Sequence, residues 1–274
     1  MIISTEKNFT FIHIPKNAGS NIREVIKKYD KYHGDFNSFI VHPLLGETHS
    51  GHLTLSEIER NYPIQYREIL DSVCFTVLRN PHDRFISALS QRLREFKNFL
   101  PVEVTQDNLA KEAREVLSLI QGKSSEELPV ELIHFRKQID YIFDQNGNQV
   151  VKNIFDIKNI PSIFDWLNSE FSLDIVYIDD QIKQNATMEI KNPFIKIFSY
   201  PFLIALKPLI NKIPNTIKHN IKVSLIKFGI YGRSDSKSIG FYEKNLSINK
   251  MVKDYYHEDI ALYHSVSNLN LISA

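Results

Sequence analysis

The chain contains two copies of one local pattern: a short apolar strand, a loop of polar residues, and an amphipathic helix. The first copy begins with the apolar run Asn8–Ile14, is interrupted by Pro15–Ser20, and continues with apolar residues at helical spacing from Ile22 to Tyr29. The second copy begins with the strand-like run Val73–Leu78. Such units place parallel strands in one sheet with helices on its faces. The sequence therefore predicts a three-layer α/β fold with a central parallel sheet flanked by helices.

Weaker patterns predict the remaining elements. The helix of the second copy is expected to run to about Phe99. Asn146-Gly147 predicts a tight hairpin turn, and Asp174–Ile178 is typical of a further strand. Apolar residues over Val252–Val266 predict a helix near the C-terminal end. No internal repeat is visible, so residues 1–274 are expected to form a single domain.

One segment differs in charge from the rest of the chain. Between Glu189 and Asp235 there is no acidic residue. The basic residues of this segment are Lys191, Lys196, Lys207, Lys212, Lys218, Lys222, Lys227 and Arg233. Apolar residues at helical spacing within it predict a basic helical subdomain at about 190–235, packed on the core. The alternative is that 191–233 forms a basic surface that contacts an anionic membrane or a polyanionic acceptor.

Composition narrows the class of protein. With 43% hydrophobic and 24% charged residues, the chain is typical of a soluble globular enzyme, and a net charge of +1 does not indicate a nucleic-acid partner. The single cysteine, Cys74, lies in an apolar run, which predicts a buried thiol in a reducing compartment. There is neither a signal-peptide pattern nor an apolar run of about 20 residues. These features predict a cytoplasmic location.

The loop Pro15–Ser20 has the residues of an anion-binding site. Backbone N–H groups and the positive end of a helix dipole meet where a strand leads into a helix. Gly19 would let the backbone approach an oxyanion closely, Ser20 adds a hydroxyl donor, and Lys16 adds a full positive charge. The loop is not a Walker A sequence, because Lys16 precedes Gly19. The alternative is an ordinary strand–helix turn with an exposed lysine.

The loop after the second strand carries another cationic group. Arg79 stands at the end of the strand, and Asn80-Pro81 suit the N-cap and the first position of a helix. Arg84 and Ser87 are three residues apart and share a face of that helix. These residues predict a phosphate site, and the alternative is a capped helix with solvated arginines. Two anion loops at the carboxyl ends of strands suit a ligand with phosphates at both ends.

Together, the two loops resemble the donor-binding motifs of sulfotransferases that use 3′-phosphoadenosine-5′-phosphosulfate (PAPS). Phe11–Ser20 resembles their 5′-phosphosulfate loop, and Phe75–Ser87 contains the Arg-x-Pro-x-x-Arg-x-x-Ser pattern of their 3′-phosphate motif. The glycan-modifying Golgi branch of this family, with its bacterial relatives, is the most similar. The resemblance implies a P-loop-like α/β fold and transfer of a sulfuryl group from PAPS to an acceptor hydroxyl. The expected acceptor is a carbohydrate.

The resemblance also implies roles for individual residues. Lys16 would bind the bridging oxygen of the leaving 5′-phosphate, and Arg79 and Ser87 would hold the 3′-phosphate. The other residues expected at the donor are Asn17, Ala18, Gly19, Ser20, Asn21 and Arg84. The sequence departs from the family at Asn17 and at Ser20-Asn21, where relatives usually have Thr and Thr-Ser. Weaker similarity extends to Gly51-His52-Leu53, to the region of Gln138 and to Tyr255–Asp259.

The reaction needs a base that takes the proton of the acceptor hydroxyl. His49 and His52 lie in the segment after the first helix, and the ordinary histidine pKa of about 6.5 suits this role. His52 matches a Gly-His element that often supplies the base in related glycan sulfotransferases. His52 is therefore the first candidate and His49 the second, while the alternative for both is a surface loop histidine. His13 is expected to be a strand residue packed beside the first loop.

Two other functions fit the same loops. A phosphotransferase would use both anion sites but would need Mg²⁺ ligands, for which the sequence shows no pattern. A non-catalytic nucleotide-binding protein would use the two sites without a base. One cysteine and the lack of a His-Glu-x-x-His spacing predict no catalytic metal. Preference for adenosine 3′,5′-bisphosphate over ATP would separate a sulfotransferase from both alternatives.

Overall fold

The computed structural model describes residues 1–100, 103–176, 188–190, 217, 224, 231–233 and 238–272. Most of the basic segment 191–233 lies outside the described residues, and so do the subdomain and the membrane contact predicted for it. At the two ends of this segment, the short strands β7 (Met188–Ile190) and β8 (Tyr231–Arg233) pair antiparallel.

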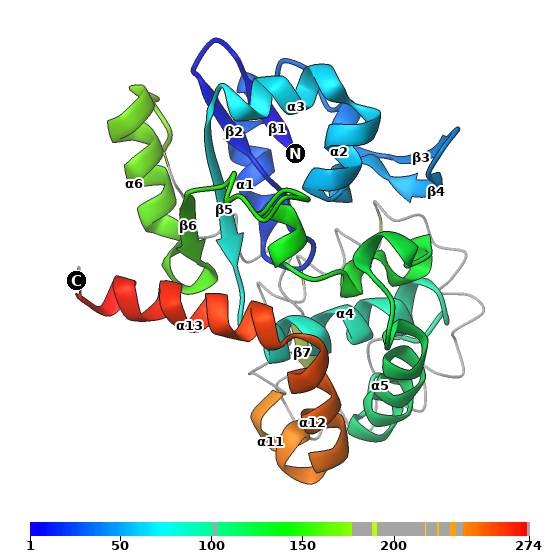
Figure 1. Ribbon diagram of the computed structural model, residues 1–274. Coiled ribbons are helices and arrows are strands. Elements are labelled where there is room, and N and C mark those ends of the chain that lie inside the picture. The colour runs from blue at the N-terminus through cyan, green and yellow to red at the C-terminus, as the bar shows by residue number, and fades with distance from the viewer. Residues whose placement is uncertain are drawn as a thin grey trace.

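A four-stranded sheet forms the centre of the molecule (Figure 1). Its strands, in spatial order, are β1 (Ile2–Ser4), β2 (Phe9–Phe11), β5 (Val73–Leu78) and β6 (Asn153–Asp156). β2, β5 and β6 are parallel, and β1 pairs antiparallel with β2. The predicted α/β architecture is therefore confirmed. The two strands predicted from the sequence, β2 and β5, are neighbours. β6 was not predicted, because its first and last residues, Asn153 and Asp156, are polar.

Helices surround this sheet and extend below it. They are α1 (Gly19–Ile26), α2 (Leu55–Asn61), α3 (Pro63–Leu70), α4 (Pro81–Glu95), α5 (Gln106–Ile120), α6 (Ile160–Phe171), α11 (Ser238–Lys244), α12 (Leu246–Tyr255) and α13 (His257–Ile272). Among the described residues, no helix is long and apolar enough to cross a bilayer.

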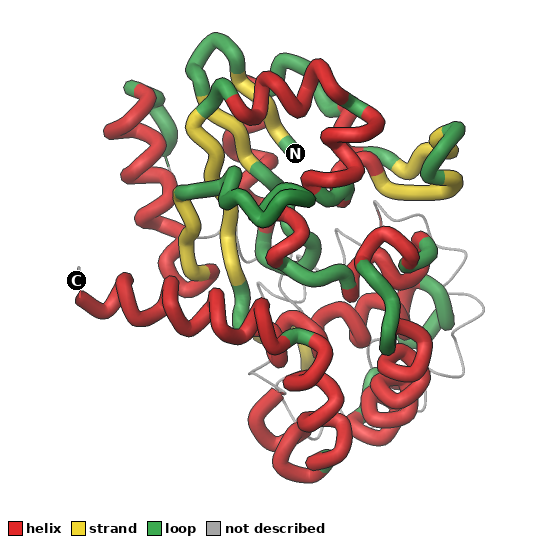
Figure 2. The backbone as a smooth tube through the Cα atoms, viewed as in Figure 1, coloured by secondary structure: helices red, strands yellow, loops and turns green. Residues whose placement is uncertain are grey.

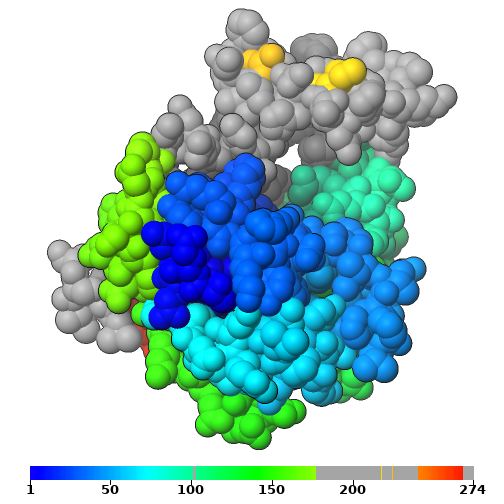
Figure 3. All heavy atoms as spheres, turned by 90° about the horizontal axis from the view of Figure 1, so that it is seen from above, coloured from blue at the N-terminus to red at the C-terminus, as the bar shows by residue number. Residues whose placement is uncertain are grey.

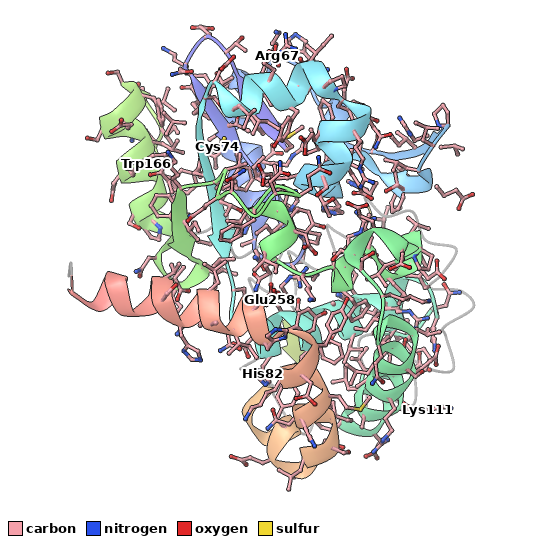
Figure 4. All side chains as sticks on the ribbon, viewed as in Figure 1. Arg67, Cys74, His82, Lys111, Trp166 and Glu258 are labelled. Atoms are coloured by element: carbon pink, nitrogen blue, oxygen red, sulfur yellow. The ribbon has the colours of Figure 1, made fainter. Side chains whose placement is uncertain are left out.

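Side chains alternate across the strands, so each face of the sheet has its own core. Phe9, Phe11 and Phe75 pack under α1 and α6. On the other face, Cys74 and Leu78 lie among side chains from α2, α3 and α13. Figure 4 shows Trp166 on α6 and Cys74 on β5 in this upper part of the molecule. The Cys74 thiol is 4% exposed and burial raises its pKa to about 11, as expected for a buried cysteine.

A third core lies below the sheet, where the chain is mostly helical (Figure 2). It is formed by α4, α5, α11 and α12 together with the 3₁₀ segment Val130–Phe135. α4 belongs to this core and begins directly after β5. It therefore connects the helical part to the carboxyl ends of the strands, where the two loops lie.

Three predictions of secondary structure were wrong, each for a local reason. The helix expected to reach Phe99 ends at Glu95, because Asn98 adopts a left-handed conformation with φ 55°. Of the strand predicted at Asp174–Ile178, residues 177 and 178 lie outside the described residues. Residues 174–176 form no strand, since the Asn168 side chain bonds both the N–H and the C=O of Ile175 at 2.9 Å. The predicted C-terminal helix is two helices, α12 and α13, which meet at the buried Tyr256.

One predicted turn is confirmed, and a further hairpin was not predicted. Asn146-Gly147 forms the predicted turn, in which Gly147 has φ 80° and a bridge joins Phe143 to Gln149. A second hairpin, β3 (Phe39–His42) with β4 (Gly46–His49), projects beside α2 (Figure 1). Figure 3 shows α6 (yellow-green) on one side of the N-terminal residues (dark blue), and the region of this hairpin on the other.

Candidate active site

The loop between β2 and α1 has a compact, irregular backbone. Lys16 and Ala18 both have positive φ angles, of 70° and 61°, which are uncommon for residues with a Cβ atom. Ala18 is the N-cap of α1, so the N–H groups of the first helical turn face the loop. Strained backbone of this kind is concentrated at functional sites because the surrounding structure must hold it in place.

Lys16 is only partly accessible and lies against α4. Its Nζ donates a hydrogen bond of 2.5 Å to Gln91 Oε1. Burial, followed by the positive charge of Arg94, lowers the pKa of Lys16 to about 8. Lys16 is therefore not the exposed lysine of the structural alternative, and its ammonium group is partly desolvated.

The two predicted anion loops are bonded directly to each other. Arg84 Nε donates to the carbonyl of Pro15 at 3.0 Å, and Arg79 Nη1 donates to the carbonyl of Lys16 at 3.2 Å. Arg84 is 1% exposed, and its Nη2 has no hydrogen-bond partner among the described residues. Arg84 thus supports the first loop from beneath, whereas Arg79 and Ser87 are both partly exposed.

Gln138 joins the same two loops from a third part of the chain. Its Oε1 accepts bonds from Asn17 Nδ2 at 2.6 Å and from the Arg79 N–H at 3.2 Å, and its Nε2 donates to the Arg79 carbonyl at 3.0 Å. Asp259 at the start of α13 accepts from the Gln138 N–H at 2.9 Å. Burial raises the pKa of Asp259 to about 6. The loops are therefore held in one fixed relation by buried polar groups.

Gly19 lies against a side chain that the sequence did not predict as its neighbour. A Cβ atom added at Gly19 would lie 2.0 Å from Cδ2 of His13, so the imidazole fills the space that a side chain would need. The structure thus gives a second reason for a glycine at this position, beside the close approach of an oxyanion that the sequence predicts. His13 is 6% exposed, which is consistent with its predicted packing beside the loop.

We expect Gly19→Ala to lower the free energy of unfolding by about 1–3 kcal/mol, the usual cost of overpacking a core. Urea denaturation would measure this change. Gly240→Ala is a matched control, because nothing lies within 4 Å of the added Cβ at that helical position. If the imidazole causes the clash, the cost should shrink in a His13→Ala background; an unchanged cost there would contradict this explanation.

Four histidine rings gather beside the first loop and form what we call the histidine cluster. Its members are His13 after β2, His49 at the end of β4, His52 in a 3₁₀ turn, and His134 in the segment Val130–Phe135. The ring centroid of His52 lies 4.3 Å from His49, 4.9 Å from His13 and 5.5 Å from His134. Burial is the main cause that lowers the pKa of His134 to about 3, and the positive charges of Lys16 and Arg84 are the next causes. The cluster therefore lies next to the lysine loop.

Hydrogen bonding distinguishes the two candidate bases. Nδ1 of His49 accepts a bond from the Gly51 N–H at 3.1 Å, so the proton of the neutral His49 ring is on Nε2. Nε2 of His49 is then a donor and not a base. Nδ1 of His52 is buried and has no hydrogen-bond partner among the described residues. The order of His52 before His49 as the base stays a prediction from the sequence.

The histidine cluster makes stability dependent on pH. Burial lowers the pKa of His49 to about 4 and that of His134 to about 3, and it holds the pKa values of His13 and His52 well below their ordinary value. Since these pKa values rise to about 6.5 on unfolding, the unfolded chain binds more protons below that pH. Acidification therefore favours unfolding.

Between about pH 7.5 and 5.5, each such histidine should remove about 1 kcal/mol of stability, so the cluster as a whole should remove several kcal/mol. Asp259, whose pKa is raised to about 6, acts in the opposite direction and offsets part of this loss. Urea unfolding over this range would measure the slope, and His134→Gln should flatten it. A stability that is constant over the range would contradict the buried, neutral state of the cluster.

Other features of the described residues lie apart from these loops. A cavity of about 540 Å³ lies between the tip of the β3–β4 hairpin, α2 and residues 126–130, and none of the loop residues or cluster histidines lines it. Within the described part of the chain, no group of three or more His, Cys, Asp or Glu side chains is placed to hold a metal ion.

Most of the predicted site residues are brought together, and several neighbours were missed. Asn17 is 1% exposed and bonds the Val77 carbonyl at 2.7 Å, while Ser20 is exposed and Asn21 is buried in the first turn of α1. Gln91 and His134 carried no motif. The only sequence signal for Gln91 was its helical spacing from Ser87. The only signal for His134 was the presence of a histidine in an irregular segment.

Comparison with known proteins identifies the family of this chain. The model of the sulfotransferase family matches residues 1–194, which is more than half of the chain and includes both anion loops and the histidine cluster. The chain belongs to the sulfotransferase family. No curated protein and no solved structure matches it. This sulfotransferase therefore has the mixed α/β fold and the sulfuryl-transfer chemistry of its family, while its donor, acceptor and catalytic residues must be argued from its own site.

Proposed function

We propose that this sulfotransferase transfers a sulfuryl group from PAPS to a hydroxyl group of a carbohydrate. The observation that carries the proposal is the direct bonding of the lysine loop to the arginine loop at the carboxyl ends of the parallel strands β2 and β5. A donor with a phosphosulfate at one end and a 3′-phosphate at the other requires two anion sites at a fixed separation. An anion site formed by one loop alone would not need hydrogen bonds that fix its position relative to the other loop.

Each end of the donor is assigned to one loop. The phosphosulfate would lie at the N-terminus of α1, near Lys16 and the N–H groups of Gly19 and Ser20. The 3′-phosphate would lie near Arg79 and Ser87 at the start of α4. Arg84 and Asn17 are buried under the loops, so we assign them to positioning the backbone and not to direct contact with the donor.

In the reaction, the acceptor oxygen attacks sulfur in line with the bond to the 5′-phosphate. The new S–O bond forms as the old one breaks, and the electron pair of the old bond goes to the phosphate oxygen of adenosine 3′,5′-bisphosphate. His52 would take the proton of the acceptor hydroxyl, and Lys16 would stabilise the charge that develops on the leaving oxygen. Because burial keeps the pKa of His52 well below its ordinary value, this imidazole is neutral at physiological pH, which is the protonation state that a base requires.

We expect Arg79→Ala and Ser87→Ala to act only on the 3′-phosphate end. Each should weaken the binding of adenosine 3′,5′-bisphosphate by about tenfold or more, because charge-assisted hydrogen bonds to phosphate are lost. Binding of adenosine 5′-phosphate, which lacks the 3′-phosphate, should be nearly unchanged. Isothermal titration calorimetry with both nucleotides measures the difference, and equal losses for the two would rule out this assignment.

A thermal-shift comparison tests the proposal as a whole. We expect adenosine 3′,5′-bisphosphate at 1 mM to raise Tm more than the same concentration of ATP with Mg²⁺, since ligand that binds only the folded state stabilises it. Transfer of ³⁵S from labelled PAPS should continue in EDTA. A larger shift with ATP, or transfer that requires Mg²⁺, would instead support a phosphotransferase. The cytoplasmic location and the membrane contact of 191–233 stay predictions that these assays do not address.

A further inference from the structure

The solvent-facing side of the β3–β4 hairpin carries large apolar side chains. Phe39 is 69% exposed and Val41 is 79% exposed. Both lie on β3, and alternation places them on one face, opposite Ile40. In register, Phe39 pairs with His49 and Val41 pairs with Glu47, so these four side chains share the same face of the hairpin. Exposed apolar side chains that adjoin one another indicate a binding surface.

This face is continuous with the histidine cluster. The Phe39 ring contacts the His49 ring edge to face, with centroids 4.9 Å apart and planes at 87°. The His49 ring in turn stacks on His52, with centroids 4.3 Å apart. Exposure falls along this series, from the open Phe39 through the half-buried His49 to His52 at 8%. A molecule seated on Phe39 would therefore lie at the entrance to the proposed base.

We propose that Phe39 is the acceptor-positioning residue of this enzyme and that a neutral, hydroxyl-bearing sugar ring stacks on it. The argument rests on the proposed function, which supplies the need for a hydroxyl at His52. The C–H groups of a sugar ring are weakly positive and match the negative face of an aromatic ring. The Glu47 carboxylate on the same face is exposed and can accept hydrogen bonds from sugar hydroxyls.

The charge on this face excludes a polyanionic acceptor. Glu47 is the charged side chain among the four that share the face, and it would repel a sulfated or carboxylated sugar. A hydrocarbon chain would bury the two apolar side chains but would leave the carboxylate and the His49 edge without hydrogen-bond partners. A sugar satisfies both kinds of group. A lipid surface is therefore the less favoured occupant, and the test below includes it.

The experiment compares Phe39→Ala with Ile64→Ala, a matched control on α3 whose side chain is also 69% exposed. Cellohexaose and chitohexaose serve as neutral acceptor probes, and ³⁵S transfer from labelled PAPS is measured. Phe39→Ala should raise the KM for the oligosaccharide by about threefold to tenfold, as expected for loss of one aromatic contact, with kcat unchanged. Phe39→Tyr should restore the KM, and Ile64→Ala should not change it.

Binding is also measured directly, without turnover. The native tryptophan, Trp166, lies on α6, across the sheet from the hairpin (Figure 4), so Phe39→Trp adds a separate fluorescent reporter. Titration with either oligosaccharide should shift its emission. The proposal is overturned if neither probe shifts the emission, or if Phe39→Ala leaves KM unchanged. It is also overturned if Phe39→Ala abolishes binding to anionic liposomes while sugar transfer is unaffected.

Affinity for adenosine 3′,5′-bisphosphate separates this result from a failure of the proposed function. Every Phe39 variant should bind this nucleotide as the unmodified protein does, because Phe39 lies on the hairpin and not in either donor loop. Normal nucleotide binding with no effect at Phe39 would reject the acceptor surface alone. Loss of nucleotide preference in the unmodified protein would reject the proposed function itself.

Discussion

His52→Ala should lower kcat by about 10²–10⁴, the range for loss of a positioned general base, while affinity for adenosine 3′,5′-bisphosphate is largely kept. The expectation follows from the position of His52 at the centre of the histidine cluster, with an Nδ1 that is not engaged by any described partner. Single-turnover transfer from labelled PAPS would measure the chemical step separately from product release.

His42→Ala is a suitable control for this experiment, because His42 lies on the same hairpin but outside the cluster. His49→Ala should reduce the rate less than His52→Ala, since Nδ1 of His49 accepts the bond from Gly51 and its Nε2 carries the proton. A large loss in His49→Ala with none in His52→Ala would assign the base to His49. If neither variant is impaired, the base is a residue outside this pair.

Lys16→Ala should lower kcat by about 10²–10³ and weaken donor binding much less. A cation that contacts the leaving oxygen acts mainly as negative charge develops in the transition state, and loss of one such donor costs about this factor. The Lys28→Ala variant provides the control, because Lys28 is an exposed lysine in the same strand–loop–helix unit. An unchanged kcat in Lys16→Ala would remove Lys16 from catalysis.

The pH dependence gives a second measure of Lys16. With the pKa of Lys16 lowered to about 8, mainly by burial, the free enzyme loses this positive charge as the pH rises through that value. The kcat/KM for PAPS should therefore fall on the alkaline side near this pKa, since kcat/KM reports groups of the free enzyme. Lys16→Ala should lack this alkaline limb, even though its rate is low throughout.

The two strand–loop–helix units could be predicted from the sequence because their signals are local. Apolar runs, the N-cap at Asn80 and the proline at position 81 each specify the conformation of a few neighbouring residues. The family match over residues 1–194 agrees with the resemblance that these loops carried. Boundaries were less predictable, since the end of α4 depends on the left-handed Asn98 and the loss of a strand at 174–176 depends on the Asn168 side chain.

The sequence by itself determined the fold class and the two cationic loops, while its order of His52 before His49 as candidate base stays a prediction. Only the tertiary structure placed His134 beside the histidine cluster, inserted Gln138 between the loops, and directed His13 against Gly19. These contacts join residues far apart in the chain, and no periodicity or spacing records which distant segments will pack together. They also depend on burial, which lowers the pKa values of Lys16 and the histidines, and burial exists only once the chain has folded.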